Sequence, residues 1–332
     1  MNPDTNEYIN ISSGHKNSIK TFLVTGGAGF IGSHLVDKLM SEGHKVICLD
    51  DLQTGDVKNT LTHRNSSHYD FIDHDVIDAY DVEVDAIYNL ACPASLSFIR
   101  ADPVHSFKTS ILGALNALDL AKRRNIPILQ ASSSEIYGDP EKHPQNESYW
   151  GNVNPVGERS CYDEGKRGAE TLFSDYYSQY GVDSKIVRIF NTYGPRMKIL
   201  DGRVVTNFIV QALKNDDIII RGDGLQTRSF CYVDDLVDGM IRLMNYSGPH
   251  LGPVNLGNTS EYTILELARI ILKKTGSKSR ISHVAATSDD PLRRRPDITL
   301  ATQRLSWSPK IPLEVGLTST IEYIENELSR VN

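Results

Sequence analysis

The sequence predicts an α/β protein with a doubly wound parallel sheet and a smaller C-terminal lobe. Three observations predict this fold class. A glycine-rich turn, 25–32, follows the apolar run 22–24 and opens an amphipathic stretch. A second apolar run ends at Asp50, eighteen residues after Gly32. Beyond it, short apolar runs continue to alternate with helical patterns, which is typical of a Rossmann-type sheet covered by helices on both faces.

The glycine turn has the position and spacing of a dinucleotide-binding loop. Gly26 and Gly29 lie between an expected strand and an expected helix, where a backbone without side chains can approach a pyrophosphate. The helix N-terminus adds free N–H groups and the positive end of its dipole. A carboxylate at Asp50 can accept both hydroxyls of an adenosine ribose and would repel a 2′-phosphate. The chain is therefore expected to bind NAD rather than NADP.

Apolar runs predict the strands, and the amphipathic stretches between them predict helices. Strands are expected at 20–25, 45–50, 68–72, 85–90, 127–132 and 185–190, and helices at 29–42, 103–124 and 162–180. After residue 190 the alternation stops, and a helix at 204–214, a strand at 228–233 and a helix at 263–274 are expected. Asp234 is expected to cap a further helix that begins with Leu236, and Thr263 with Glu266 matches a capping box.

These patterns divide the chain into three parts. Residues 1–19 are polar and are expected to form a flexible leader. Residues 20–190 are expected to form the NAD-binding Rossmann domain, and residues 191–332 a smaller substrate-binding lobe. About 228–258 of that second part is expected to return to the Rossmann sheet.

The composition is that of a globular enzyme and excludes several other classes. Of the 332 residues, 39% are hydrophobic and 23% charged, and the net charge of −7 argues against a nucleic-acid partner. No apolar run is long enough to cross a membrane, and no secretory signal is expected. Four scattered cysteines without a CxxC pair indicate reduced thiols in a cytoplasmic protein. The histidines show no metal-like spacing, so no metal site is expected.

Tyr162 and Lys166 lie four residues apart on an expected helix and therefore share one of its faces. A lysine ammonium beside a phenol favours the phenolate and lowers its pKa from about 10. Such a phenolate can remove a hydroxyl proton while hydride leaves for a nicotinamide. A tyrosine and a lysine at this spacing are usually unrelated surface residues. Because the dinucleotide-binding turn lies upstream, a catalytic role is favoured here.

Ser133 and Glu135 follow an expected strand, at the edge where parallel sheets bind ligands. The Ser133 hydroxyl can bond to the reacting oxygen together with Tyr162, whereas a polar loop with a solvated glutamate is the simpler alternative. Arg228 follows Gly222-Asp223-Gly224, and we expect it to bind phosphate because a guanidinium matches a pyrophosphate. Arg294 lies in a basic run that by charge pattern alone would face solvent.

Taken together, the motifs TGGxGxxG, SSSEIYG and YDEGK resemble the extended short-chain dehydrogenase/reductase family, whose members act largely on nucleotide-sugars. The resemblance is closest to the UDP-glucuronate decarboxylases (UDP-xylose synthases) of that family. It is carried by the runs 90–95, 149–155, 157–167, 188–197, 201–205, 226–230 and 289–297. The similar region covers about 21–317, nearly the whole chain.

The resemblance implies roles for individual positions. NAD would be surrounded by Gly26, Gly29, Phe30, Ile31, Asp50, Asp51, Thr54, Gly55, Asp75, Val76, Leu90, Lys108, Tyr162, Lys166 and Thr192. The nucleotide-sugar would face Arg159, Asn191, Arg203, Val205 and Arg228. Catalysis would fall to Tyr162, Lys166, Ser133, Glu135 and Arg294, with Ser133 standing where the family usually has threonine.

The implied reaction is redox-neutral. Tyr162 would take the proton of the sugar 4-hydroxyl while hydride passes to NAD, and the resulting 4-keto acid would lose CO₂. Tyr162 and Ser133 would stabilise the enolate oxygen, and Glu135 or Arg294 would place a proton at C5 through water. Return of the hydride from NADH to C4 would then give UDP-xylose. The resemblance also makes the helix 162–180 a dimer helix, expected to expose Leu172, Phe173, Tyr176 and Tyr177.

One segment departs from the family pattern. Where the family has a tyrosine that faces the sugar, this chain has Ile99, in a loop, 96–102, that is expected to lie over the sugar. Arg100 either turns inward to hold an anionic substituent or faces water. This departure leaves other activities open: a 4-epimerase, a 4,6-dehydratase, a 4-dehydrogenase or a non-catalytic NAD-binding scaffold. Dehydratases of the family commonly carry Asp-Glu where this chain has Ser134-Glu135, and a scaffold would not need Tyr162 and Lys166.

Overall fold

A seven-stranded parallel sheet organises the protein, as a computed structural model describes it for residues 18–199, 202–285 and 293–331. The sheet contains β1 (Thr21–Thr25), β2 (Lys45–Asp50), β3 (Tyr69–Asp73), β4 (Ala86–Asn89), β5 (Ile128–Ser133), β6 (Ser184–Ile189) and β11 (Pro253–Leu256). Their order is β11-β6-β5-β4-β1-β2-β3, so the chain winds outward from β1 in both directions. The predicted doubly wound α/β fold is confirmed.

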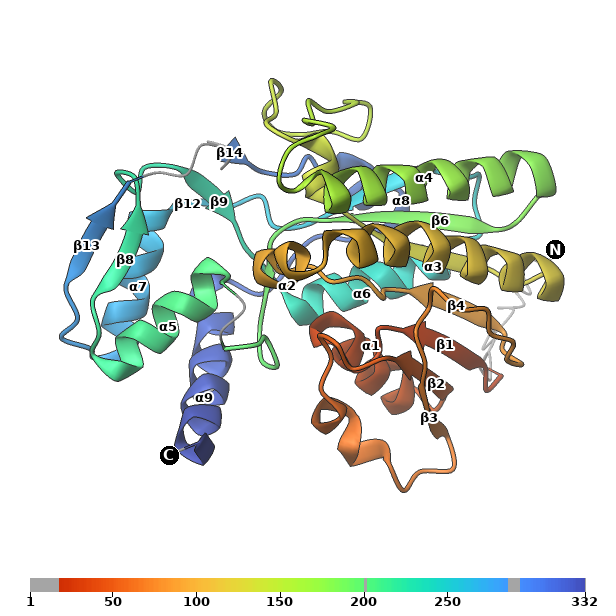
Figure 1. Ribbon diagram of the computed structural model, residues 1–332, viewed down its shortest axis with the longest axis horizontal. Coiled ribbons are helices and arrows are strands. Elements are labelled where there is room, and N and C mark those ends of the chain that lie inside the picture. Colours follow the sequence, from red (N-terminus) through yellow and green to blue (C-terminus); the bar gives the residue numbers. More distant parts are fainter. Residues whose placement is uncertain (1–17, 200–201, 286–292, 332) are drawn as a thin grey trace, which may run out of the picture.

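Helices cover both faces of this sheet (Figure 1). On one face α3 (Pro103–Arg124) and α4 (Ser160–Tyr180) pack side by side against the central strands. On the other, α1 (Phe30–Ser41) and α6 (Val233–Met244) pack together, and α8 (Thr299–Leu305) covers β11. Each face has its own apolar core, built around Leu35 and Leu236 on the α1 side and around Leu23 and Phe173 on the α4 side. Burial on both faces explains why the strands read as short, nearly continuous apolar runs.

The C-terminal part of the chain builds a smaller lobe at one end of the sheet, drawn in green to blue at the left of Figure 1. Its helices are α5 (Val204–Lys214), α7 (Ile264–Thr275) and α9 (Leu313–Val331). Its strands pair as β8 (Ile218–Arg221) with β13 (Ile281–Val284), and as β9 (Thr227–Ser229) with β12 (Glu261–Thr263) and β14 (Arg293–Arg294). Between the lobes β7 (Thr192–Tyr193) pairs with β10 (Cys231–Tyr232). The predicted capping box is present at the start of α7.

Two predictions for this region are wrong. The strand expected at 228–233 is divided into β9 and β10, which belong to different sheets. The helix expected to begin at Leu236 begins at Val233, with Tyr232 as its N-cap, so Asp234 lies in the first turn and does not cap it. A helix can start here without a side-chain cap because Asp234 and Asp235 place negative charge at its positive end.

Three short helical turns lie in the connections near the carboxyl ends of the strands. They are η1 (Val57–His63), α2 (Leu96–Ala101) and η2 (Ser134–Tyr137). The segment 96–102, expected to be a loop, is therefore largely helical. Among the described residues, no helix is both long and apolar enough to span a bilayer. The predicted leader, 1–19, falls almost entirely outside the described residues.

Candidate active site

A cavity of about 1470 Å³ lies between the sheet and the smaller lobe. The carboxyl ends of β1, β2, β4, β5 and β6 open onto it, which is where open parallel sheets bind ligands. A buried chain of hydrogen bonds holds three of these strand ends together. The Thr25 hydroxyl donates to the Asn89 side-chain oxygen at 2.7 Å, and the Asn89 amide donates to Gln130 at 2.7 Å. The strands behind the cavity are therefore held together by buried polar side chains that the apolar pattern does not reveal.

The glycine turn after β1 is shaped for close approach by a ligand. Gly26 has a φ of +68°, and a Cβ there would lie 2.8 Å from the backbone nitrogen of Ala91. At Gly32 a Cβ would collide with the Gly26 carbonyl oxygen. Both positions therefore exclude other residues, and the turn leaves bare backbone at the start of α1, where N–H groups can bind a pyrophosphate.

Asp50 ends β2 at the rim of the same turn. Its carboxylate accepts hydrogen bonds from the Ala28 N–H at 3.0 Å and the Leu52 N–H at 2.9 Å, and these fix its orientation. Burial raises the pKa of this carboxyl group, and the two backbone donors oppose that shift. Asp50 lines the cavity beside Gly26 and Gly29, so turn and acid meet as a dinucleotide site requires.

Most of the residues predicted to surround NAD line this cavity. Those that do are Gly26, Gly29, Phe30, Ile31, Asp50, Asp51, Thr54, Val76, Leu90, Tyr162, Lys166 and Thr192. Gly55, Asp75 and Lys108 are not among the lining residues. Gly55 lies behind Asp50, where a Cβ would be 2.7 Å from its carboxylate, and the Lys108 side chain is exposed on α3.

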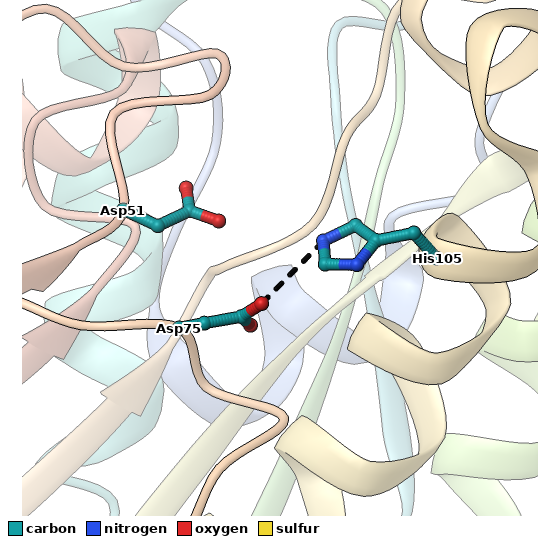
Figure 2. A group of neighbouring side chains, drawn as sticks. All are labelled: Asp51, Asp75 and His105. Carbon is teal, nitrogen blue, oxygen red and sulfur yellow. Dashed lines mark ion pairs between the residues drawn. The ribbon is translucent and has the colours of Figure 1, made fainter.

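Asp51, Asp75 and His105 meet beside the Asp50 end of the cavity (Figure 2). One ligand atom of each lies within 4.8 Å of the others, and the His105 Nε2 is 3.8 Å from the Asp75 Oδ2 and 3.0 Å from the Gln53 side-chain nitrogen. Sequence spacing misses this group because its members follow β2, follow β3 and open α3. The predicted absence of a metal site stays a prediction.

Tyr162 and Ser133 face each other on one wall of the cavity. Tyr162 is buried in the first turn of α4, and Ser133 ends β5 and forms a hydrogen bond with it. The Lys166 ammonium donates to the Ala131 carbonyl at 2.8 Å and lies 5.8 Å from the centre of the Tyr162 ring. The predicted lowering of the Tyr162 pKa is wrong for the protein alone, because burial outweighs every other influence and raises this pKa.

Glu135 lies between two arginines on the adjoining wall. Its carboxylate accepts hydrogen bonds from the Arg294 guanidinium at 2.5 and 2.9 Å. It also forms an ion pair with the Arg159 guanidinium at 2.8 Å. Although burial acts in the opposite direction, these two charges lower the pKa of Glu135 to about 2. Glu135 and Arg159 line the cavity, whereas Arg294 is only 6% exposed, lies behind Glu135 and is not among the lining residues.

The residues predicted to bind the nucleotide-sugar all line the cavity: Arg159, Asn191, Arg203, Val205 and Arg228. The side-chain nitrogen of Asn191 is buried and has no hydrogen-bond partner among the described residues. A buried amide donor without a partner is rare in a folded protein, so this nitrogen fits a ligand atom. Arg228 is buried too, and its guanidinium donates to the Thr227 carbonyl at 2.8 Å.

The altered segment contacts the cavity through residues other than the predicted one. Ile99 is 1% exposed and does not line the cavity, so it cannot replace a sugar-facing tyrosine. Phe98 and Arg100 line it instead. Arg100 pairs with Glu158 at 2.5 Å, and the Lys198 ammonium lies 4.9 Å from the Phe98 ring centre. Helical geometry at 96–101 explains the difference, since it turns neighbouring side chains to different sides.

Comparison with known proteins shows the family of this chain. Residues 22–257 match the model of the NAD dependent epimerase/dehydratase family. The chain belongs to this family. UDP-glucuronic acid decarboxylase 4 of Arabidopsis thaliana is 52% identical over 307 residues, which are 92% of this chain and 69% of that protein. UDP-glucuronic acid decarboxylase 1 of Danio rerio is 51% identical over 309 residues, or 93% and 73% of the two chains. The predicted resemblance is confirmed.

Solved structures of the family share the fold. UDP-glucose 4-epimerase of Thermotoga maritima, solved with UDP-glucose, superposes with a TM-score of 0.84 at 28% identity and covers 93% of this chain and 99% of its own. UDP-glucuronic acid 4-epimerase of Bacillus cereus was solved in complex with UDP-glucuronic acid and NAD. It superposes with a TM-score of 0.82 at 25% identity, and the match covers 92% of this chain and 99% of that chain. Both of these structures therefore hold a UDP-sugar, and one of them also holds NAD.

Proposed function

We propose that this protein is a UDP-glucuronate decarboxylase that converts UDP-glucuronate to UDP-xylose through a 4-keto sugar, with NAD as its resident cofactor. The observation that carries the proposal is the wall where the Ser133–Tyr162 pair adjoins Glu135 and its two arginines. The first pair suits oxidation at a hydroxyl, and the second group suits a substrate that carries a carboxylate. Relatives named as UDP-glucuronic acid decarboxylases at about half identity support the same substrate.

NAD, when bound, accepts the hydride of the sugar C4 and returns it after decarboxylation. Gly26, Gly29 and Asp50 are proposed to hold its pyrophosphate and ribose. Among the other predicted positions, Gly55 would act by leaving room for Asp50, and Asp75 by placing His105. Lys108 is exposed on α3 and does not line the cavity, so no contact supports a role for it in binding NAD.

In the first step Tyr162 takes the proton of the 4-hydroxyl, and the Ser133 hydroxyl holds the same oxygen. Burial raises the Tyr162 pKa and the Arg203 charge opposes that shift, so this proton transfer needs more positive charge near the phenol than these groups supply. Lys166 supports the wall by fixing the Ala131 carbonyl, two residues before Ser133.

In the second step the 4-keto acid loses CO₂, because the electrons of the broken bond delocalise into the ketone. Tyr162 and Ser133 then stabilise the enolate oxygen. Glu135 is ionised at neutral pH, so its role is to orient water for protonation of C5 rather than to donate its own proton. Arg294 acts through Glu135, because it lies behind that carboxylate.

We propose that residues 20–190 bind NAD and residues 191–332 bind the nucleotide-sugar. Asn191, Arg203, Val205 and Arg228 come from the second part and line the cavity, and Arg159 reaches it from the first. Within 228–258, α6 packs on the sheet and β11 joins it as an edge strand. The second part would therefore be anchored to the first by its own chain.

Release of CO₂ tests the function directly. Purified protein with NAD should liberate one CO₂ for each UDP-glucuronate consumed and yield UDP-xylose. A 4-epimerase, as several structural neighbours are named, shares the first oxidation but retains the carboxylate. Formation of UDP-galacturonate without release of CO₂ would therefore show a 4-epimerase instead of a decarboxylase. A protein that binds NAD but converts no nucleotide-sugar would favour the non-catalytic scaffold.

We expect the protein to bind NAD at least tenfold more tightly than NADP, because Asp50 would repel a 2′-phosphate. Asp50→Asn removes the charge and keeps the shape, so it should narrow this preference. Affinity for both cofactors is measured by calorimetric titration. Equal affinity of the unmodified protein for the two would contradict the ribose assignment.

We also propose a homodimer built on α3 and α4. Apolar side chains remain exposed along both helices, among them Val104 and Phe107 on α3 and Tyr177 on α4. The prediction that α4 exposes Phe173 is wrong, because Phe173 lies in the core and Leu172 and Tyr176 pack against that core. The exposed apolar surface therefore extends over the outer faces of α3 and α4, which Figure 1 shows running side by side.

Light scattering should give a mass about twice 37.0 kDa, and Phe107→Glu should give a monomer by placing a charge in an apolar interface. Val315→Glu is the matched control, since Val315 is exposed on α9, away from α3 and α4. A monomeric unmodified protein, or a Phe107→Glu variant that stays dimeric, would remove α3 and α4 as the interface.

A cytoplasmic location is proposed as well. Cys48, Cys92, Cys161 and Cys231 all carry free thiols. Free thiols persist where glutathione and thioredoxin keep cysteines reduced.

A further inference from the structure

One carboxyl oxygen of the half-buried Asp163 is enclosed without a partner, within reach of the charges of Glu135, Arg159 and Arg294. Asp163 directly follows Tyr162 in the first turn of α4. Its Oδ1 is inaccessible to solvent and makes no hydrogen bond with any residue that the structure describes. A buried carboxylate oxygen without a donor is costly when the group is charged. The surroundings of Asp163 therefore favour its neutral form, unlike those of Glu135.

Charged groups of three elements act on Asp163. Glu135 of η2 and Glu164 of α4 disfavour its ionisation, and Arg159 at the start of α4 and Arg294 of β14 favour it. Burial and the Glu135 charge prevail, and together they raise the pKa of Asp163 to about 7. Glu135, by contrast, stays ionised over the whole neutral range. Near neutral pH, Asp163 is thus the member of this group whose charge changes.

The protonation state of Asp163 decides the net charge next to the cavity. Glu135, Arg159 and Arg294 together carry one net positive charge, since two guanidinium groups face one carboxylate. An ionised Asp163 would cancel that charge, and a neutral Asp163 would leave it in place. Arg159 lines the cavity and faces both acids, so the charge is available to a ligand there.

We propose that neutral Asp163 leaves this cluster with a positive charge that selects a nucleotide-sugar bearing an anionic substituent, and that ionisation of Asp163 abolishes the selection. The inference rests on the proposed function and names the group that sets its preference for a sugar acid. Asp163 is a positioning residue, because it acts through Arg159 and Glu135 and does not itself line the cavity.

A purely structural role for Asp163 predicts something different. A carboxylate in the first turn of a helix favours the helix through its dipole. Removing that charge would change stability, and it would leave the pH dependence of substrate preference as it was. The pH profile of ligand discrimination therefore separates the two roles.

The matched ligands are UDP-glucuronate and UDP-glucose, which differ only in a carboxylate against a hydroxymethyl group. Binding is measured by calorimetry between pH 6 and 8.5 with NAD present, in a Tyr162→Phe background that prevents turnover. The preference for UDP-glucuronate should fall roughly tenfold over this range, as expected for one added charge in a partly buried site. With Asp163→Asn the preference should keep its pH 6 value throughout.

Glu164→Gln is the control, because Glu164 is the next residue on the same helix turn and pairs with Arg167 at 3.5 Å. Its charge is the smallest of those that raise the pKa of Asp163, so the preference of this variant should still fall with pH as in the parent, displaced slightly to lower pH. The parent protein should also take up a fraction of a proton when it binds UDP-glucuronate at pH 7.5, measured in two buffers of different ionisation heat. The Asp163→Asn variant should take up less.

Two outcomes would overturn the inference: a preference that falls with pH in Asp163→Asn as in the parent, or a parent protein whose preference does not change with pH. The proton-uptake measurement on the parent keeps the test valid if Asp163→Asn folds poorly. These are binding measurements, so they stay informative if the protein releases no CO₂, which would contradict the proposed function alone.

Discussion

Replacing Tyr162 by phenylalanine should lower decarboxylase turnover by about a hundredfold or more while substrate binding persists. The substitution removes the hydroxyl that meets Ser133 and keeps the buried ring, so the cavity wall retains its shape. Without the phenol oxygen, no second side chain among the described residues is bonded to Ser133 and able to take the 4-hydroxyl proton. Release of CO₂ from saturating UDP-glucuronate measures turnover, and calorimetry measures binding.

Tyr177→Phe is the matched control for this prediction. Tyr177 lies on the same helix but is exposed and stacks on His250, with ring centres 3.8 Å apart. Its hydroxyl has no place in the cavity, so turnover should stay within a factor of two or so of the unmodified protein. A Tyr162→Phe variant with near-normal turnover would remove Tyr162 from the proposed mechanism.

The parts of the site that were predicted from the sequence are those whose chemistry depends on local spacing. The glycine turn and Asp50 meet at one rim because consecutive parallel strands bring their carboxyl ends together. Tyr162 and Lys166 share a helix face for a reason equally local, the helical period. Ser133 could be placed next to Tyr162 only because β5 and α4 are adjacent in a doubly wound fold.

The parts that could not be predicted depend on contacts between distant segments. Arg294 meets Glu135 from a position 159 residues away, and only packing of the smaller lobe against the sheet brings them together. Asp51, Asp75 and His105 converge from three different connections, so no motif marks them. The same holds for the Arg100–Glu158 pair, which joins α2 to the segment before α4.

Burial accounts for two of the predictions that failed. Aromatic residues on α4 were expected to be exposed because the helix carries more apolar surface than one lobe needs, yet the face that carries Phe173 packs on the sheet. Similarly, the effect of Lys166 on Tyr162 was expected from charge alone, whereas desolvation dominates the pKa of a fully buried phenol. Neither degree of burial can be inferred from spacing within a single helix.

Replacing Glu135 by glutamine should destabilise the protein by about 3 kcal/mol at neutral pH and lower turnover at least tenfold. The carboxylate accepts three charged hydrogen bonds or ion pairs from Arg159 and Arg294, and its side chain is only 17% exposed. Glutamine has nearly the same size but takes away the carboxylate to which both guanidinium groups are bonded. Denaturant midpoints measure the stability, and CO₂ release measures the turnover.

The pH dependence of this loss has a definite sign. The folded protein lowers the pKa of Glu135 from 4.5 to about 2. Ionised Glu135 therefore stabilises the folded state above about pH 4.5, and its contribution disappears as pH falls toward 2. The difference in free energy of unfolding between the unmodified protein and Glu135→Gln should accordingly be largest above pH 5 and shrink steadily below it. Urea titrations at a series of pH values measure that difference.

Glu158→Gln serves as the control, because Glu158 precedes Arg159 in the chain and pairs with Arg100 at 2.5 Å, but its side chain is 66% exposed. An exposed ion pair contributes about 0–1 kcal/mol, so this variant should be nearly as stable as the unmodified protein at every pH. If Glu135→Gln were less stable by the same amount at pH 3 as at pH 7, its loss would come from packing. Charge would then not be what holds Glu135 between Arg159 and Arg294.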